Sequence, residues 1–204
     1  MTGRLNLLQP AAALAIVSAA AGLAGCASPE ARYYTLSPAA EVRPATTPVP
    51  SQAPEPVWIE VAPVRVPERI NRANLVLSNS SGRLRLLEQD RWPVSFPDEF
   101  RDALSQRLQV SLGAVDTYQH GRSGVASLYR VSAEVVQIDA EIDERVSAIV
   151  NWTVRRLPDG KVTVGHTRAD LAAAGGVDGV VAAYQQVVIN TAADISAAVR
   201  SLRS

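Results

Sequence analysis

Residues 129–164 read YRVSAEVVQIDAEIDERVSAIVNWTVRRLPDGKVTV, and the rest of the chain can be interpreted outward from this stretch. Apolar and polar residues alternate along Tyr129–Val135 and again along Val146–Val154, which predicts two half-buried strands. The parity of the alternation switches at the end of the first strand, which indicates a β-bulge. Pro158-Asp159-Gly160 predicts a turn into a third strand at Val162–Val164. We therefore predict an antiparallel meander.

Amphipathic helices are predicted on both sides of the meander. Ahead of it, apolar residues recur with helical spacing from Phe100 to Leu112, after a start at Pro97-Asp98 and before a stop at Gly113. After it, a second apolar stripe runs from Val180 to Leu202. Each stripe covers one side of its helix, as expected for helices that pack on a sheet.

Further strands are predicted upstream. Val57–Val61 alternates, and Leu75–Leu77 and Arg83–Leu87 flank a polar loop in the manner of a hairpin. Prolines bracket Val64-Arg65-Val66, which places that segment at a sheet edge or in an extended connection. The element order is roughly β-β-β-α-β-β-β-β-α. We predict an α+β domain over residues 57–204, with a mainly antiparallel β-sheet and two helices packed on one face.

Residues 1–25 have the pattern of a lipoprotein signal peptide. Arg4 precedes an apolar run of about 15 residues, shorter than the ~20 residues of a membrane-spanning helix. The run ends in Leu23-Ala24-Gly25-Cys26, where small residues permit cleavage between Gly25 and Cys26. We expect acyl chains on the thiol and freed amine of Cys26, because two or three chains anchor a protein durably. A chance Cys at the end of another leader or membrane segment is the alternative.

Residues 26–56 are predicted to link the anchor to the domain. Seven of the thirteen prolines of the chain fall there, which favours an extended, semi-rigid spacer. Arg32–Leu36 interrupts the spacer with a short strand that is able to join the edge of the main sheet. Ala27 follows the lipidated residue where an Asp would favour retention in the inner membrane, so we expect attachment to the periplasmic face of the outer membrane.

The composition argues against most kinds of chemistry. Lys+Arg 20 balance Asp+Glu 20, so the charge excess that marks nucleic-acid binders and electrostatic membrane-surface modules is missing. The single Cys excludes an internal disulfide and a Cys-based zinc site. His120 and His166 are interpreted as structural or exposed, and the acidic residues of 139–144 as a solvated hairpin tip. We predict no catalytic residue, metal or cofactor; a hydrolase without a recognisable motif stays an alternative.

The order of motifs in the mature chain resembles a known family. After the Cys26 box come Tyr33-Tyr34-Thr35-Leu36, then Ile59–Val64, then Arg91-Trp92 ahead of a helix, then a strand containing Trp152. This order is similar to that of the ABC-type transport auxiliary lipoproteins, which include the paraquat-inducible protein C kind. One departure follows Arg91-Trp92, where residues 93–97 read PVSFP instead of a small residue, an acid and Pro-Leu.

The resemblance implies a non-enzymatic role in lipid transport. Its expected partners are a substrate-binding protein with mammalian-cell-entry (MCE) domains and, through it, an ABC permease or another inner-membrane component. Lipid is the implied cargo. A structural or assembly lipoprotein that docks on another outer-membrane machine is the alternative.

Two segments are predicted to contact the partner, or further copies of the chain in a ring. The Arg65–Arg72 connection and the Arg91–Phe96 segment both mix Arg with apolar residues and Pro, and Arg and Trp are enriched in interface hot spots. The candidate contact residues are Arg65, Arg72, Arg91 and Trp92. The alternative is that these arginines are only solvated and that Trp92 belongs to the core.

Overall fold

The structure is a computed structural model, which describes residues 29–37, 56–79, 81–118 and 127–203. The signal peptide, Cys26, His120 and most of the Pro-rich stretch lie outside the described residues. The strands are β1 (Arg32–Tyr33), β2 (Val57–Val61), β3 (Asn74–Ser78), β4 (Leu84–Arg91), β5 (Ala114–Asp116), β6 (Leu128–Glu141), β7 (Arg145–Leu157) and β8 (Val162–Ala172); the helices are η1 (Glu68–Ile70), α2 (Phe96–Leu112) and α3 (Gly176–Arg203). Residues 31–204 cluster into one compact unit, which contains all of these elements.

The predicted meander is confirmed as the antiparallel part of a five-stranded sheet. The strand order is β5-β2-β6-β7-β8, and β6, β7 and β8 pair antiparallel in succession. The pairing of β6 with β7 shifts register between Val135 and Gln137, at the position where the alternation switches parity. The structure therefore confirms both the α+β class and the bulge.

Parallel pairing is the main difference from the expected sheet. β2 pairs parallel with both β5 and β6, and β1 pairs parallel with β4. A second, three-stranded sheet has the order β1-β4-β3. Alternation within one strand carries no information about distant partners, and β5 is only three residues long, too short for an alternation to show. β8 also continues to Ala172, well beyond the predicted strand at Val162–Val164.

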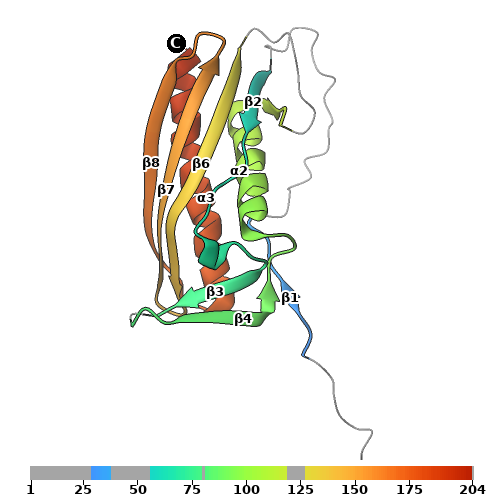
Figure 1. The fold of residues 1–204 in the computed structure, drawn as a ribbon, viewed down its shortest axis with the longest axis vertical. Coiled ribbons are helices and arrows are strands. Elements are labelled where there is room, and N and C mark those ends of the chain that lie inside the picture. The colour runs from blue at the N-terminus through green and yellow to red at the C-terminus, as the bar shows by residue number, and fades with distance from the viewer. Residues whose placement is uncertain (1–28, 38–55, 80, 119–126, 204) are drawn as a thin grey trace, which may run out of the picture. The chain divides into compact units, whose positions relative to one another are not determined.

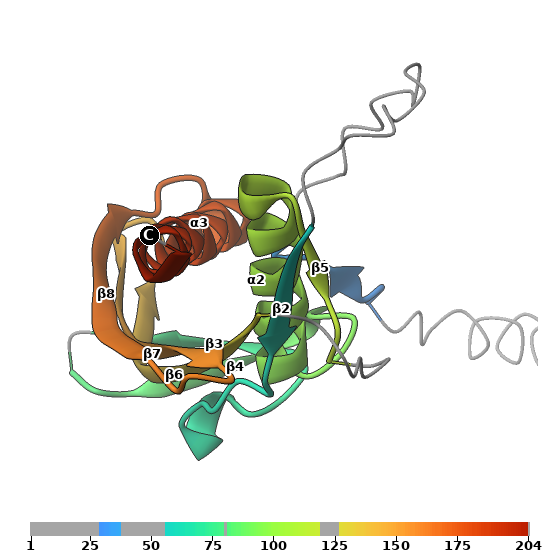
Figure 2. The same cartoon turned by 90° about the horizontal axis from the view of Figure 1, so that it is seen from above.

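Both helices lie on one face of the five-stranded sheet, as predicted. Figure 2 shows β6, β7 and β8 curving around α3, with α2 beside it and next to β2 and β5. The inward side chains of α3 include Val180, Val187 and Ile195, and each is fully buried. None of the helices in the described residues is long and apolar enough to cross a bilayer.

The hairpin of β3 and β4 lies at the end of this unit where α3 begins, and the carboxyl end of α3 lies at the other end (Figure 1). Since α3 has 28 residues at about 1.5 Å rise each, its two ends are about 42 Å apart. The unit thus has two distinct ends.

Candidate docking site

The segment before the Pro-rich stretch is bound tightly to the domain; we call residues 31–37 the strap. Its first contacts are with Asp90 of β4, a carboxylate that is almost fully buried. Arg32 forms an ion pair with Asp90 at 2.7 Å, and the Tyr34 hydroxyl donates a hydrogen bond to the same carboxylate at 3.2 Å. Burial and the Asp90 charge both raise the pKa of Tyr34, which keeps its hydroxyl a donor.

A second buried carboxylate holds the far part of the strap. Glu99, in the first turn of α2, accepts hydrogen bonds from the Thr35 hydroxyl at 2.5 Å and from the Leu36 backbone N–H at 2.7 Å. The Leu36 side chain is only 1% exposed. Gln185 of α3 donates from Nε2 to the Thr35 carbonyl at 2.8 Å. The strap is therefore part of the folded domain, held by β4, α2 and α3.

The structure brings the two predicted contact segments together at this end of the domain. The Trp92 backbone N–H donates to the Ala73 carbonyl at 2.6 Å, and the Phe96 N–H donates to the Arg72 carbonyl at 3.0 Å. Arg72 is exposed, and Arg91 is half-buried with its Nε bonded to the Glu88 carbonyl. Arg72 therefore lies next to the β4–α2 connection, and its side chain is exposed to solvent.

Arg65 is placed differently, against the middle of the large sheet. Its backbone bonds to β6 through the carbonyl of Ala133 and the N–H of Val135. Its exposed guanidinium pairs with Glu134 at 3.2 Å. Arg65 and Arg72 therefore belong to one connection but to separate parts of the surface.

Trp92 does not lie on the surface, which corrects the expectation that its side chain forms part of a docking surface. Its side chain is 2% exposed and stacks on Tyr184 of α3, with ring centroids 6.0 Å apart. Phe96 packs against both rings at 5.8 Å. An indole beside these rings gains more from burial than from contact with water, so Trp92 joins β4 and α2 to α3 as a core residue.

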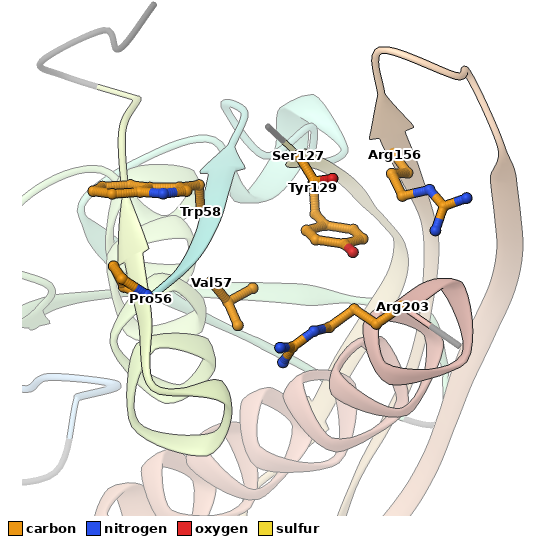
Figure 3. Close-up of a pocket in the computed structure, with 7 residues that line it drawn as sticks. All are labelled: Pro56, Val57, Trp58, Ser127, Tyr129, Arg156 and Arg203. Carbon is orange, nitrogen blue, oxygen red and sulfur yellow. The ribbon is translucent and has the colours of Figure 1, made fainter. Parts of the chain in front are cut away.

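A polar cavity of about 270 Å³ lies at the opposite end of the unit (Figure 3). Figure 3 shows the Tyr129 ring and the Arg203 side chain extending toward the space between them. The residues that line it are Pro56, Val57, Trp58, Ser127, Tyr129, Arg156 and Arg203. The Arg203 guanidinium beside a phenol and an indole is suited to bind an anionic group such as a carboxylate or a phosphate. Sequence reasoning missed this cavity because its residues come from distant parts of the chain.

Arg156 is already engaged at the cavity wall. It pairs with Asp159 at 2.5 Å and also donates to the Leu202 carbonyl at the end of α3. The hydrogen bond with Arg156 lowers the pKa of Asp159, and the same bond raises the pKa of Arg156. Arg156 therefore joins the β7–β8 turn to the end of α3.

The acidic hairpin tip has structural partners. Asp143 accepts hydrogen bonds from the backbone N–H groups of Gly175 and Gly176 at 3.1 and 2.7 Å, which fixes the approach to α3. Asp139 pairs with Arg69 at 3.3 Å. His166 is exposed on β8. Across the described ranges, no group of three or more His, Cys, Asp or Glu side chains is arranged to hold a metal ion.

Comparison with known proteins assigns the chain to a protein family. The family described as the ABC-type transport auxiliary lipoprotein component matches residues 34–196, which include every described strand except β1, the whole of α2 and most of α3. The chain belongs to this family of auxiliary components of transport systems, which is not a known enzyme family. This confirms the family resemblance drawn from the sequence motifs.

Solved structures agree on the fold. The chain is similar to a crystal structure of an uncharacterised protein, with 16% identity, a TM-score of 0.63, and coverage of 83% of this chain and 99% of that one. It is also similar to a Xanthomonas campestris protein, with 12% identity, a TM-score of 0.50, and coverage of 72% and 86%. No curated protein matches the chain. At these identities the structural likeness concerns the fold alone.

Proposed function

We propose that this protein is a non-enzymatic auxiliary lipoprotein of an MCE/ABC-type lipid transport system, anchored to the periplasmic face of the outer membrane. The observation that carries the proposal is the family match over residues 34–196, which begins eight residues after the candidate lipidation site at Cys26. A membrane-attached adaptor needs an anchor, a rigid domain and a docking surface. The sequence offers the first, and the fold supplies the second.

We place the proposed docking surface at Arg72 and the β4–α2 connection. These segments are held rigidly by the backbone bonds at Ala73 and Arg72 and by the buried Trp92 beneath them. A preordered surface loses little conformational entropy when a partner binds. The exposed Arg72 guanidinium is then available to a carboxylate on the MCE protein, while Arg65 offers a second contact on the sheet.

The test is capture of the tagged full-length protein from cross-linked membranes, followed by mass spectrometry. An MCE-domain protein should be recovered, together with ABC permease subunits or another inner-membrane component. Arg72→Ala should reduce that recovery several-fold. Arg168→Ala, which removes an equal charge from β8, is the matched control and should leave the recovery unchanged. Recovery of an unrelated outer-membrane complex in place of the MCE protein would establish the assembly-lipoprotein alternative.

The anchor is tested separately. Cys26→Ser removes the thiol that receives the diacylglycerol, so we expect no acylation and an uncleaved precursor held by its leader. Intact-protein mass spectrometry and membrane fractionation measure both. Ser28→Ala, two residues away and outside the Leu23–Cys26 box, is the control and should mature normally. Normal maturation of the Cys26→Ser protein would contradict the assignment.

A further inference from the structure

The position of the strap limits the distance between the folded domain and its proposed anchor at Cys26. Because the strap is bound by Asp90 and Glu99, only residues 27–31 separate Cys26 from Arg32, the first strap residue that bonds to the domain through its side chain. Residues 38–55, which hold five of the seven prolines of residues 26–56, connect the strap to β2 instead. An extended chain covers at most about 3.6 Å per residue, so the chain allows at most about 22 Å between Cys26 and Arg32.

The strap enters the domain at a defined end. Arg32 pairs with Asp90 near the end of β4. Thr35 then lies beside Gln185 of α3. In Figure 1, β1 lies at the end of the unit occupied by β3, β4 and the start of α3. The cavity lined by Trp58 and Arg203 lies at the opposite end, about 40 Å along α3.

The two neighbouring tyrosines of the strap are placed in opposite ways. Tyr34 packs against the core and bonds to Asp90, whereas the Tyr33 side chain is 64% exposed. The Arg32 side chain next to it is also 63% exposed although it pairs with Asp90. An exposed aromatic ring beside a cation is the combination found at the level of lipid headgroups, because the ring is apolar at its face and polar at its tip.

We propose that the strap lies against the phospholipid leaflet that holds the acyl chains, with Tyr33 at the headgroup level and the Trp58–Arg203 cavity directed away from the membrane. Arg72 then lies at the edge of this membrane contact, where a partner protein that reaches the leaflet can still bind it. The occupant of this surface is the bilayer, because a link of five residues from a lipidated Cys26 keeps the strap within about 22 Å of the leaflet and the exposed Tyr33 ring suits the headgroup region. The inference rests on the proposed function for that lipidation. It fixes the orientation of the domain, which a long Pro-rich spacer would have left free.

Hydroxyl-radical footprinting of the unsubstituted lipidated protein tests the orientation. The protein is reconstituted into vesicles of phosphatidylethanolamine and phosphatidylglycerol, and oxidation is measured at Tyr33 and at Trp58. The reference is the unlipidated chain from Ala27 to Ser204, mixed with the same vesicles. We expect oxidation of Tyr33 to fall at least threefold in the lipidated protein, while oxidation of Trp58 stays within experimental error of the reference.

The outcomes separate the two proposals. Intact-protein mass spectrometry first establishes whether Cys26 carries acyl chains, and their absence would defeat the proposed anchor. If the chains are present and Tyr33 is oxidised as readily as in the reference, the orientation is wrong while the anchor stands. Equal protection of Tyr33 and Trp58 would also overturn the orientation, since both ends of the unit cannot rest on one leaflet.

Discussion

At the scale of single residues, Trp92 has the largest predicted effect on stability. It is buried between Phe96 and Tyr184, so replacement by Ala leaves a cavity where β4, α2 and α3 meet. We expect Trp92→Ala to lower the free energy of unfolding by about 3–5 kcal/mol, measured by urea denaturation. Val94→Ala, two residues away on a side chain that is 44% exposed, should change it by no more than about 0.5 kcal/mol. Similar values for both variants would show that Trp92 is not a core residue.

Tyr184 gives the domain a pH dependence at the alkaline end. Burial raises the pKa of its hydroxyl well above the ordinary value of 10.0. Above about pH 10 the unfolded chain loses this proton while the folded chain keeps it, so stability falls as pH rises, with a slope that approaches about 1.4 kcal/mol per pH unit.

Tyr184→Phe removes this contribution. Relative to the unsubstituted protein, the variant should gain about 1 kcal/mol between about pH 10 and about pH 11, and almost nothing between about pH 8 and about pH 9. Urea denaturation across this range measures the difference. A constant difference at every pH would mean that the Tyr184 hydroxyl ionises equally well in the folded state.

At the scale of elements, the close packing of β7 against β8 depends on one pair of residues that lie opposite each other, Trp152 and Gly165. Gly165 lies directly across from Trp152, whose Nε1 donates to Thr167 at 3.3 Å; Thr167 in turn donates to Asp194 of α3 at 2.6 Å. A Cβ added at Gly165 would lie 2.5 Å from Trp152 Cη2 and 2.9 Å from Cε2. The indole therefore occupies the space that any other residue at position 165 would need.

This contact predicts strong coupling between the two positions. Gly165→Ala should destabilise the domain by about 1–3 kcal/mol through overpacking. In a Trp152→Leu background the same change should cost clearly less, because the smaller side chain leaves room for the methyl group. A double-mutant cycle in urea measures the coupling, and additive effects would show that the close approach does not matter.

Elements with local signals were predictable, and elements defined by distant partners were not. The alternation in β6 and β7, including the bulge after Val135, is visible in the sequence because each strand buries one face against α3. The parallel pairing of β2 with β5 and β6 produces no comparable pattern in the sequence. The strap was visible as a short strand, but its two acceptors were not, since Asp90 and Glu99 look like surface acids until burial is known.

At the scale of the whole molecule, the folded domain begins at the strap rather than at β2. A chain that starts at Val57 lacks Leu36 and leaves two buried carboxylates without the donors that the strap supplies. We expect residues 57–204 to be less stable than residues 31–204 by about 3 kcal/mol or more, from lost apolar burial and lost bonds to charged groups. Thermal and urea unfolding of the two chains measure the difference. Equal stability would show that the strap contributes nothing to the free energy of unfolding.

The candidate sites also differ in how far they could be predicted from the sequence. The predicted contact segments could be picked out because Arg, Trp and Pro cluster in sequence, but the burial of Trp92 depends on α3, about 90 residues later. The Trp58–Arg203 cavity could not be anticipated, because it is assembled from the ends of β2, β6, β7 and α3.

The parallel register of β2 also bears on the order in which the chain acquires its structure. β6, β7 and β8 follow one another through short turns, and α3 comes directly after them, so their contacts close small loops. β2 meets β6 across 70 positions, with β3, β4, α2 and β5 in between. Closing long loops costs entropy before any contact repays it, so non-local pairings form slowly. The C-terminal half is therefore expected to assemble first and to serve as the template on which β2, and then the strap, are added.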